Sequence, residues 1–441
     1  MAVYDASQLE KMKETFTIGI IGLGDMGRLY ANVISKAGWK VNACDTPDKT
    51  EELKKEFAPT SICIMDDGFA VSRASDYIIY SVEAEKIDAV VGKYGPATKM
   101  GAIVGGQTSC KTPEIAAFEK YLPEDVQIIS CHSLHGPAVN PKSQPLIIIR
   151  HRASDEAFAV VNYMFQCFGS SLAYLSAGEH DRITADTQAV THAAFLTMGA
   201  AWHSNQQYPW EINRWCGGIE NIKMNLSLRI YSSKWHVYAG LAILNPYARK
   251  QIKQYAASVT DLYKLAVTGR NEEFERRVRA AGIAVFGEHR DHNYSGLLLS
   301  DDLLDQYSIS NVPNDKTVPN SHLSILAIVD SWAKLGIKPQ KQMICSTPLF
   351  RLWVGVAEYI FRQPEMLDRA IKVMLRQSDF CSDDLEFVIA ARSWSDCVEN
   401  GDFDTYKKRF LKTKEYFRPR FEESRVVCNA MISKLMENLH K

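Results

Sequence analysis

The sequence predicts an α/β amino-terminal domain, Rossmann-like and doubly wound, followed by an all-α carboxyl-terminal region built from two repeated helical units. Three observations predict this fold. Short apolar segments alternate with helical patterns over the first 178 residues, a glycine-rich turn joins the first apolar segment to the first helix, and two sets of long helical patterns fill the remainder. Such alternation is typical of a mostly parallel sheet with helices on both faces.

Six apolar segments are expected to form the sheet, with helical patterns such as LYANVISKAG and EIAAFEKYL between several of them. They are FTIGII (16–21), KVNACD (40–45), YIIYS (77–81), GAIVGG (101–106), VQIISC (126–131) and PLIIIR (145–150). The predicted organisation is a sheet domain at 1–178, a first helical unit at 179–295, a linker at 296–320 and a second helical unit at 321–441.

Composition narrows the class of protein. A chain of 441 residues, 46% apolar and 23% charged, is too long for one ordinary core and typical of a globular protein. Its net charge of −1 favours neither nucleic acid nor an anionic membrane as a partner. No signal peptide and no membrane-spanning run is recognisable. Ten cysteines without a CxxC pair predict reduced thiols, a cytoplasmic location and no metal.

The turn Gly22-x-Gly24-x-x-Gly27 closes the first predicted strand and opens the first predicted helix. Glycines with this spacing permit a tight turn and let the backbone approach a pyrophosphate, so the turn predicts dinucleotide binding. The expected cofactor-binding residues are Gly22, Leu23, Gly24, Asp25, Met26, Gly27 and Asp45. Asp45 ends the second strand, where an acid favours the ribose of NAD and repels the 2′-phosphate of NADP. Thr46 and Lys49 follow it and would soften that repulsion.

Two histidines occur in CHSLHGP, just after the apolar run VQIIS. Ligands of an open parallel sheet bind at the carboxyl ends of its strands, and this edge receives both His132 and Ser109. We predict His132 as an acid–base residue, with the Ser109 hydroxyl beside it facing the nicotinamide region. His135 lies in the following turn and is expected to be structural. A metal pair is not expected, because no third ligand lies at a suitable offset.

A polar stripe runs along the first long helix, EHDRITADTQAVTHAAFLTMGAAW. His180, Thr184, Gln188 and His192 recur every four residues and would share one face. The stripe contains neither Lys nor Glu, which a solvent-exposed helix face usually carries. It indicates either a solvated face or the lining of a polar cleft, and both remain open.

The helical region contains an internal repeat with an offset of 130 residues, in which THAAFLTMGAAW aligns with SHLSILAIVDSW. The offset drifts by a residue or two further on, but the order of the matches is kept over about a hundred positions. The matched pairs are His192 with His322, Leu196 with Leu326, Trp202 with Trp332 and Pro209 with Pro339.

Four motifs resemble those of the prephenate/arogenate dehydrogenase family, in particular its fungal type: CHSLHGP, GGQTSCK, EHDRITADTQAVTH and STPLFRL. The resemblance covers nearly the whole chain. Bacterial members have H-P-M-x-G-P in the first motif, so His132 matches the catalytic histidine, although the proline with its fixed dihedral is lost. The other matches are Ser109 and Lys111 to S-x-K, His180, Asp181 and His192 to H-D with a second histidine, and Ser346, Pro348 and Arg351 to S-x-P-x-x-R.

The resemblance implies an enzyme of tyrosine biosynthesis that oxidatively decarboxylates prephenate to 4-hydroxyphenylpyruvate and reduces NADP. It implies that His132 accepts the hydroxyl proton and that Ser109 holds the same oxygen. Donor or cationic groups must hold the two substrate carboxylates. The candidates are Arg351, His192, Gln188, Lys111 and His180. The fungal type uses NADP, which conflicts with Asp45, so NADP is the predicted cofactor and NAD the alternative.

Helical domains of this family pair in homodimers, and this chain carries both halves of such a pair. We therefore expect a monomer with an internal pseudo-dimer, a homodimer being the alternative, in which the second copy supplies Arg351 and the first has Asn221 in its place. Two other functions remain open. A β-hydroxyacid dehydrogenase needs a catalytic lysine, for which Lys223 in GGIENIKMNLS is a candidate, and a non-catalytic nicotinamide-binding regulator needs neither Ser109 nor His132.

Overall fold

The computed structural model describes residues 4–137, 139–212, 217–288, 306–309, 319–345, 347–376 and 381–439. Most of the predicted linker, 296–320, lies outside the described residues. The chain forms two compact units, Met1–Ile183 and Thr184–Lys441, each of which is described by itself.

The boundary between the units lies later than residue 178, where the sequence predicts it. The reason is that helix α8 (Ala177–Thr184) is bound to the first unit. Its Asp181 carboxylate accepts hydrogen bonds from the backbone N–H groups of Lys111 and Thr112, at 2.7 Å each.

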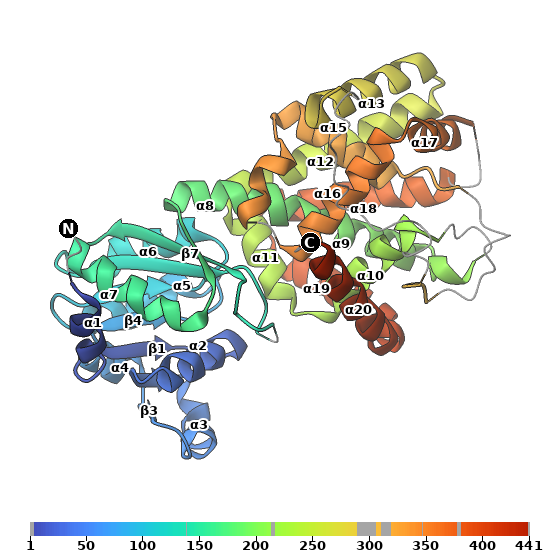
Figure 1. The fold of residues 1–441 in the computed structure, drawn as a ribbon. Helices are drawn as coiled ribbons and strands as arrows, with labels where there is room; N and C mark the ends of the chain where they lie inside the picture. Colours follow the sequence, from blue (N-terminus) through green and yellow to red (C-terminus); the bar gives the residue numbers. More distant parts are fainter. Residues whose placement is uncertain are drawn as a thin grey trace. The chain divides into compact units, whose positions relative to one another are not determined.

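The first unit is built on one eight-stranded sheet with the order β3-β2-β1-β4-β5-β6-β7-β8 (Figure 1). Neighbouring strands are parallel except β6 and β7. The strands are β1 (Thr17–Ile21), β2 (Lys40–Cys44), β3 (Ile62–Ile64), β4 (Tyr77–Tyr80), β5 (Ile103–Gly106), β6 (Gln127–Ser133), β7 (Pro145–Arg152) and β8 (Ser171–Tyr174). The predicted fold class of this region is confirmed. The sequence missed β3 and β8, which are short edge strands with little buried apolar surface.

Side chains of the central strands alternate between two cores, one on each face of the sheet. In β1, Ile18 and Ile20 enter one core with α2 and α7, whereas Ile21 enters the other with α4, α5 and α6. The helices of this unit are α1 (Ala6–Met12), α2 (Asp25–Lys36), α3 (Thr50–Phe57), α4 (Gly68–Ala74), α5 (Ile87–Tyr94), α6 (Lys111–Tyr121), α7 (Asp155–Phe165) and α8. Because β5 and β6 are adjacent and parallel, the segments that follow them emerge at one edge.

Strand β6 is longer than the sequence predicts. His132 lies within it, opposite Ile147 of β7, and not after its end. The antiparallel partner β7 extends the hydrogen-bonded ladder to Ser133, which the apolar pattern of β6 alone could not indicate.

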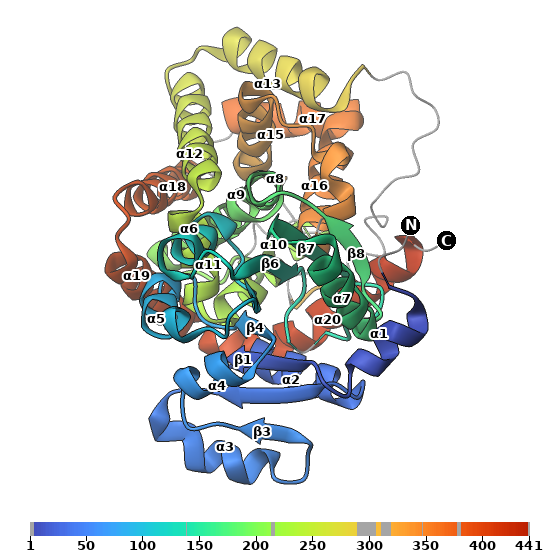
Figure 2. The same ribbon diagram turned by 90° about the vertical axis from the view of Figure 1, so that its left-hand side faces the viewer.

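The second unit is helical and has one large hydrophobic core, whose members run from Ala185 to Met431. Helix α12 packs against both α15 and α18, and α9 packs against α18 (Figure 2). The helices are α9 (Val190–Ser204), α10 (Ile219–Ser232), α11 (Trp235–Leu244), α12 (Pro246–Val267), α13 (Asn271–Phe286), α15 (Leu323–Leu335), α16 (Pro348–Arg362), α17 (Pro364–Arg376), α18 (Cys381–Glu399), α19 (Phe403–Phe417) and α20 (Phe421–Leu439). Within the described residues, no helix is long and apolar enough to cross a membrane.

The order of these helices agrees with the predicted repeat. The matched prolines Pro209 and Pro339 each begin a 3-10 helix, η5 (Pro209–Glu211) and η7 (Pro339–Cys345). The cross-packing is reciprocal as well, because α12 contacts α15 and its counterpart α18 contacts α9. The repeat itself stays a prediction. The two copies share one core, so they are not separately packed units.

Candidate functional site

The glycine-rich turn has the backbone geometry that a dinucleotide phosphate needs. Gly22 has a φ of 104°, and a Cβ there would collide with the carbonyl oxygen of Ser81. A Cβ on Gly27 would collide with the carbonyl oxygen of Gly22, whereas one on Gly24 would meet nothing within 4 Å. Gly24 also begins α2 without a side-chain cap, which leaves the first N–H groups of the helix for an anion. These residues therefore fit a pyrophosphate.

Asp45, which follows β2, is bonded on both carboxylate oxygens. It accepts hydrogen bonds from the backbone N–H of Leu23 at 2.8 Å and of Thr46 at 2.7 Å, and its other partner is the Lys49 ammonium at 3.0 Å. Burial raises the pKa of Asp45, but the bonds from Thr46, Lys49 and Leu23 lower it further, so the carboxylate is ionised. Lys49 offsets this charge, which weakens the repulsion that the sequence predicts for a 2′-phosphate.

His132 begins a buried chain of hydrogen bonds. Its Nδ1 lies 2.8 Å from Nε2 of His180, and Nδ1 of His180 lies 2.9 Å from Oδ1 of Asp181. The backbone N–H groups of Lys111 and Thr112 donate to the same carboxylate. Residues of β6, α8 and the first turn of α6 therefore meet, although up to 71 positions separate them along the chain.

This bonding order decides where the protons lie. An ionised carboxylate only accepts, so Nδ1 of His180 donates to Asp181, and Nε2 of a neutral His180 accepts from Nδ1–H of His132. Nε2 of a neutral His132 is then a proton acceptor.

The pKa shifts agree with these protonation states. Burial lowers the pKa of His180, and it holds the pKa of His132 well below the ordinary value, with His180 and Lys111 lowering it further. Burial would raise the pKa of Asp181, but the bonds from His180, Lys111 and Thr112 lower it overall. At neutral pH the chain therefore holds two neutral imidazoles and one carboxylate.

The predictions that Lys111 and His180 bind substrate are corrected by their positions. Lys111 is wholly buried, and its ammonium lies 2.8 Å from a carboxylate oxygen of Glu114 and 2.7 Å from the carbonyl oxygen of Cys131. This enclosed ion pair joins β6 to α6 and cannot reach a substrate. His180 is also wholly buried, behind His132, and is placed to orient that ring.

The remaining predicted residues of the sheet edge are less enclosed. Ser109 is half-buried in the segment that follows β5, at the same edge as the end of β6. His135 is half-buried in the turn after β6, and its Nδ1 lies 3.0 Å from the carbonyl oxygen of Gly136. These contacts agree with a structural His135.

Gln188 and His192 lie in the second unit, where the helix is irregular. The segment Ala185–Ala189 is a π-helix, which breaks the four-residue spacing of the predicted stripe and is frequent at functional sites. Among the described residues, neither Nε2 of Gln188 nor Nδ1 of His192 has a hydrogen-bond partner, although both atoms are buried. Burial lowers the pKa of His192 to about 4, so the imidazole is neutral. Unpaired buried polar atoms are rare and suit a ligand-binding role.

Arg351 lies in the first turn of α16 and is half-buried. Burial lowers its pKa, yet a guanidinium keeps its charge in proteins. It therefore remains a candidate for holding a carboxylate. Ser346, which belongs to the same predicted motif, lies outside the described residues.

The sequence analysis missed two functional candidates. Asp181 was matched to a motif without a role, although its place next to His180 is a usable signal for a histidine-orienting acid. Arg28 follows the glycine-rich turn directly; it donates to the carbonyl oxygen of Leu23 and pairs with Glu56 at 2.8 Å. A cation at this place was a signal for phosphate binding that composition alone did not give. The described part of the chain holds no cluster of three or more His, Cys, Asp or Glu suited to a metal.

Two family models match the chain. Residues 17–175 match the NAD binding domain of 6-phosphogluconate dehydrogenase. Residues 189–437, more than half of the chain, match a model described as a 6-phosphogluconate dehydrogenase C-terminal domain.

Three curated proteins are similar to the chain in sequence. A Schizosaccharomyces pombe protein named "Probable prephenate dehydrogenase", with NADP(+) in its name, is 72% identical over 430 residues, which are 98% of this chain and 100% of that protein. The NADP(+)-dependent prephenate dehydrogenase of Saccharomyces cerevisiae is 53% identical over 440 residues, 98% of this chain and 96% of that protein. A "Probable arogenate/prephenate dehydrogenase" of Methanocaldococcus jannaschii is 22% identical over 277 residues, 61% of each chain.

Proposed function

The chain belongs to the family of NADP(+)-dependent prephenate dehydrogenases, and from this premise we propose that it converts prephenate and NADP into 4-hydroxyphenylpyruvate, carbon dioxide and NADPH in tyrosine biosynthesis. The observation that supports this chemistry best is the buried chain from His132 through His180 to Asp181. It provides a neutral, oriented base at the sheet edge where ligands of this fold bind.

His132 acts as the base. As the ring carbon that carries the hydroxyl becomes carbonyl-like, the hydroxyl proton passes to Nε2 of His132, and the Ser109 hydroxyl holds the same oxygen. His180 and Asp181 keep the imidazole oriented and stabilise the imidazolium that forms. Loss of the ring carboxylate as carbon dioxide completes an aromatic ring, so this second event needs no further acid–base group.

The glycine-rich turn and the start of α2 hold the pyrophosphate of the cofactor. When bound, NADP supplies the acceptor for the hydride that leaves the ring carbon. Asp45 and Lys49 lie at the end of β2, which binds the adenosine ribose in this fold. Because Lys49 offsets the charge of Asp45, this end of the strand accommodates a 2′-phosphate.

Asp45→Ser should leave the Kd for NADP unchanged or lower it, because the variant removes a negative charge near the 2′-phosphate. Lys49→Ala should weaken NADP about fivefold and NAD hardly at all, since an exposed pair of this kind is worth up to about 1 kcal/mol. Direct titration of each variant with NADP and with NAD, followed by calorimetry, measures both effects. A wild-type protein that binds NAD ten times more tightly than NADP would contradict the cofactor assignment.

The two carboxylates of prephenate need donors, and the second unit offers three. Arg351 is cationic, while Gln188 and the neutral His192 carry buried polar atoms without partners among the described residues. A guanidinium holds a carboxylate through two charge-assisted hydrogen bonds. We assign Arg351 to one carboxylate, with Gln188 and His192 as further donors.

Arg351→Ala should raise the KM for prephenate tenfold or more, since a charge-assisted hydrogen bond is worth about 1.5–3 kcal/mol. The Kd for NADP should not change. Steady-state kinetics of Arg351→Ala and of the control Arg376→Ala, an exposed arginine at the end of α17, measure the difference. A wild-type KM for prephenate in Arg351→Ala would show that the anion is held elsewhere.

The function itself is tested by mixing the protein with prephenate and NADP and recording the absorbance of NADPH. Turnover is expected, and the same assay with arogenate ranks the two related substrates. Oxidation of a 3-hydroxy acid in place of prephenate would identify a β-hydroxyacid dehydrogenase. Cofactor binding without turnover of any of these substrates would indicate the nicotinamide-binding regulator.

We also infer that the active protein is a cytoplasmic monomer whose two helical copies form an internal pseudo-dimer. The reciprocal packing of α12 on α15 and of α18 on α9 supports this inference. Light scattering behind a sizing column should give the mass of one chain, and twice that mass would favour the homodimer.

A further inference from the structure

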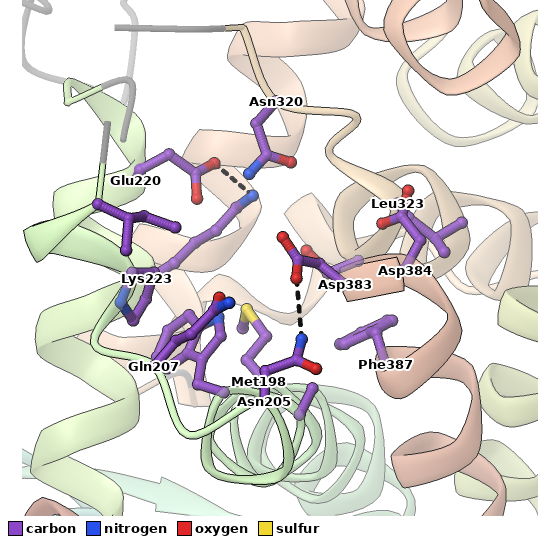
Figure 3. Close-up of a pocket in the computed structure, with 15 residues that line it drawn as sticks. Met198, Asn205, Gln207, Glu220, Lys223, Asn320, Leu323, Asp383, Asp384 and Phe387 are labelled. Carbon is purple, nitrogen blue, oxygen red and sulfur yellow. Dashed lines mark hydrogen bonds and ion pairs between the residues drawn. The ribbon is translucent and has the colours of Figure 1, made fainter. Parts of the chain in front are cut away.

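A cavity of about 90 Å³ lies within the second unit, and none of the catalytic or substrate-binding residues assigned above lines it. It is enclosed by α9, α10, the start of α15 and the start of α18 (Figure 3). A water molecule needs about 10–15 Å³ on this measure, so the space holds roughly six waters or one small organic molecule.

The described lining of the cavity contains one lysine and three carboxylates, so its charge is unbalanced. The lysine is already used: the ammonium of Lys223 lies 2.5 Å from a carboxylate oxygen of Glu220, and both side chains are buried. Burial raises the pKa of Glu220, but Lys223 and His322 lower it to about 2, so the ion pair persists. His322 contacts both partners through Nδ1, and burial lowers its pKa, so it adds no charge at neutral pH.

The other two carboxylates lie on the opposite wall. Figure 3 shows Asp383 and Asp384 of α18 facing the Lys223–Glu220 pair. Asn205 donates to Asp383 at 2.8 Å and Ser321 donates to Asp384 at 2.9 Å. Within the described residues, Asp384 forms no ion pair. Burial, with Asp383 beside it, raises the pKa of Asp384 to about 7, which shows how poorly its charge is compensated.

The remaining walls suit an apolar body. Trp202, Met198 and Phe387 line the cavity next to the acidic pair. The backbone is strained beside it as well: of the three non-glycine residues with positive φ in the described chain, His322 (52°) and Gln206 (53°) adjoin this lining. Strain of this kind is retained mainly where the surrounding structure serves a function.

We propose that this cavity binds a small organic ammonium ion, with its charged group at Asp383 and Asp384 and its apolar body against Trp202 and Phe387. An ammonium supplies three donors and the positive charge that Asp384 lacks. Aromatic walls attract both the cation and an apolar substituent. An anionic ligand is disfavoured, because the only lysine among the described lining residues is already paired with Glu220.

A series of three isosteric probes tests the proposal: benzylamine, benzyl alcohol and benzoate, each titrated into the full chain by calorimetry at pH 8. Benzylamine should bind at least tenfold more tightly than either of the others. Its affinity should rise about tenfold from pH 6 to pH 8, as Asp384 loses its proton while Asp383, Glu220 and Lys223 keep their charges.

Asp384→Asn should abolish both the preference for the amine and its pH dependence. Asp396→Asn, an exposed acid on the same helix, is the matched control and should behave as the wild type does. Equal binding of benzylamine and benzyl alcohol by the wild type, or no binding of either, would overturn the proposal even if Asp384→Asn failed to fold. Retention of the amine preference in a folded Asp384→Asn protein would also overturn it.

Discussion

Replacing His132 by Asn should lower kcat for prephenate oxidation about a hundredfold or more, the usual contribution of a positioned general base. The Kd for NADP should stay near that of the wild type, because the cofactor-binding turn does not involve this side chain. A base acts only while it is neutral, and burial holds the pKa of His132 well below 6.5. The acid limb of the kcat/KM profile should therefore lie below pH 6.5.

Two other variants separate the roles within this part of the chain. His135→Asn should change kcat little, since that ring contacts only the adjacent turn in the contacts described. Asp181→Asn should give an intermediate loss, because an amide can also donate and would no longer fix the tautomers of His180 and His132. Equal losses in His132→Asn and His135→Asn would refute the assignment of the base.

A chain that ends at Pro319 should not fold into a soluble second unit. The two predicted copies share one core, in which Phe195 of α9 contacts Trp353 of α16 at 4.9 Å between ring centroids. Each large apolar side chain that loses its cover forfeits about 1.5–3 kcal/mol, and many such losses exceed a typical stability of about 5–15 kcal/mol. Aggregation or forced dimerisation is the expected result, measured by sizing chromatography and by binding of a hydrophobic dye.

Co-expression of residues 320–441 as a separate chain provides the control for this truncation. It should restore solubility by covering the faces of α9 and α12 that α18 and α15 contact in the intact chain. A monomeric chain of residues 1–319 with full helical content would show that the second copy is a separable appendage. The inference of an internal pseudo-dimer would then fail.

The sequence by itself determined the elements whose signals are local. The glycine spacing at 22–27 predicts the turn that the structure contains, because a positive φ at Gly22 and the close approach at Gly27 exclude side chains there. Runs of β-branched residues separated by helical patterns predict the central strands. His132 could be placed at the sheet edge for the same reason, since parallel strands bring their carboxyl ends together.

The tertiary structure decided what surrounds these residues. Nothing in the local pattern indicates that Lys111 is buried on Glu114, or that His180 stands behind His132 and not in a substrate cleft. The same holds for Asp45, whose charge is answered by a lysine one helical turn later and by the backbone of Leu23.

The physical reason lies in the range of the forces that each level of analysis can use. Backbone sterics and hydrophobic periodicity act over a few residues and are legible in a single sequence. Desolvation, which lowers the pKa of His132 and raises that of Asp384, depends on which distant segments exclude water around the group. The fold of the first unit was therefore predictable from its sequence, whereas the protonation of its base and the acidic cavity of the second unit required the packed chain.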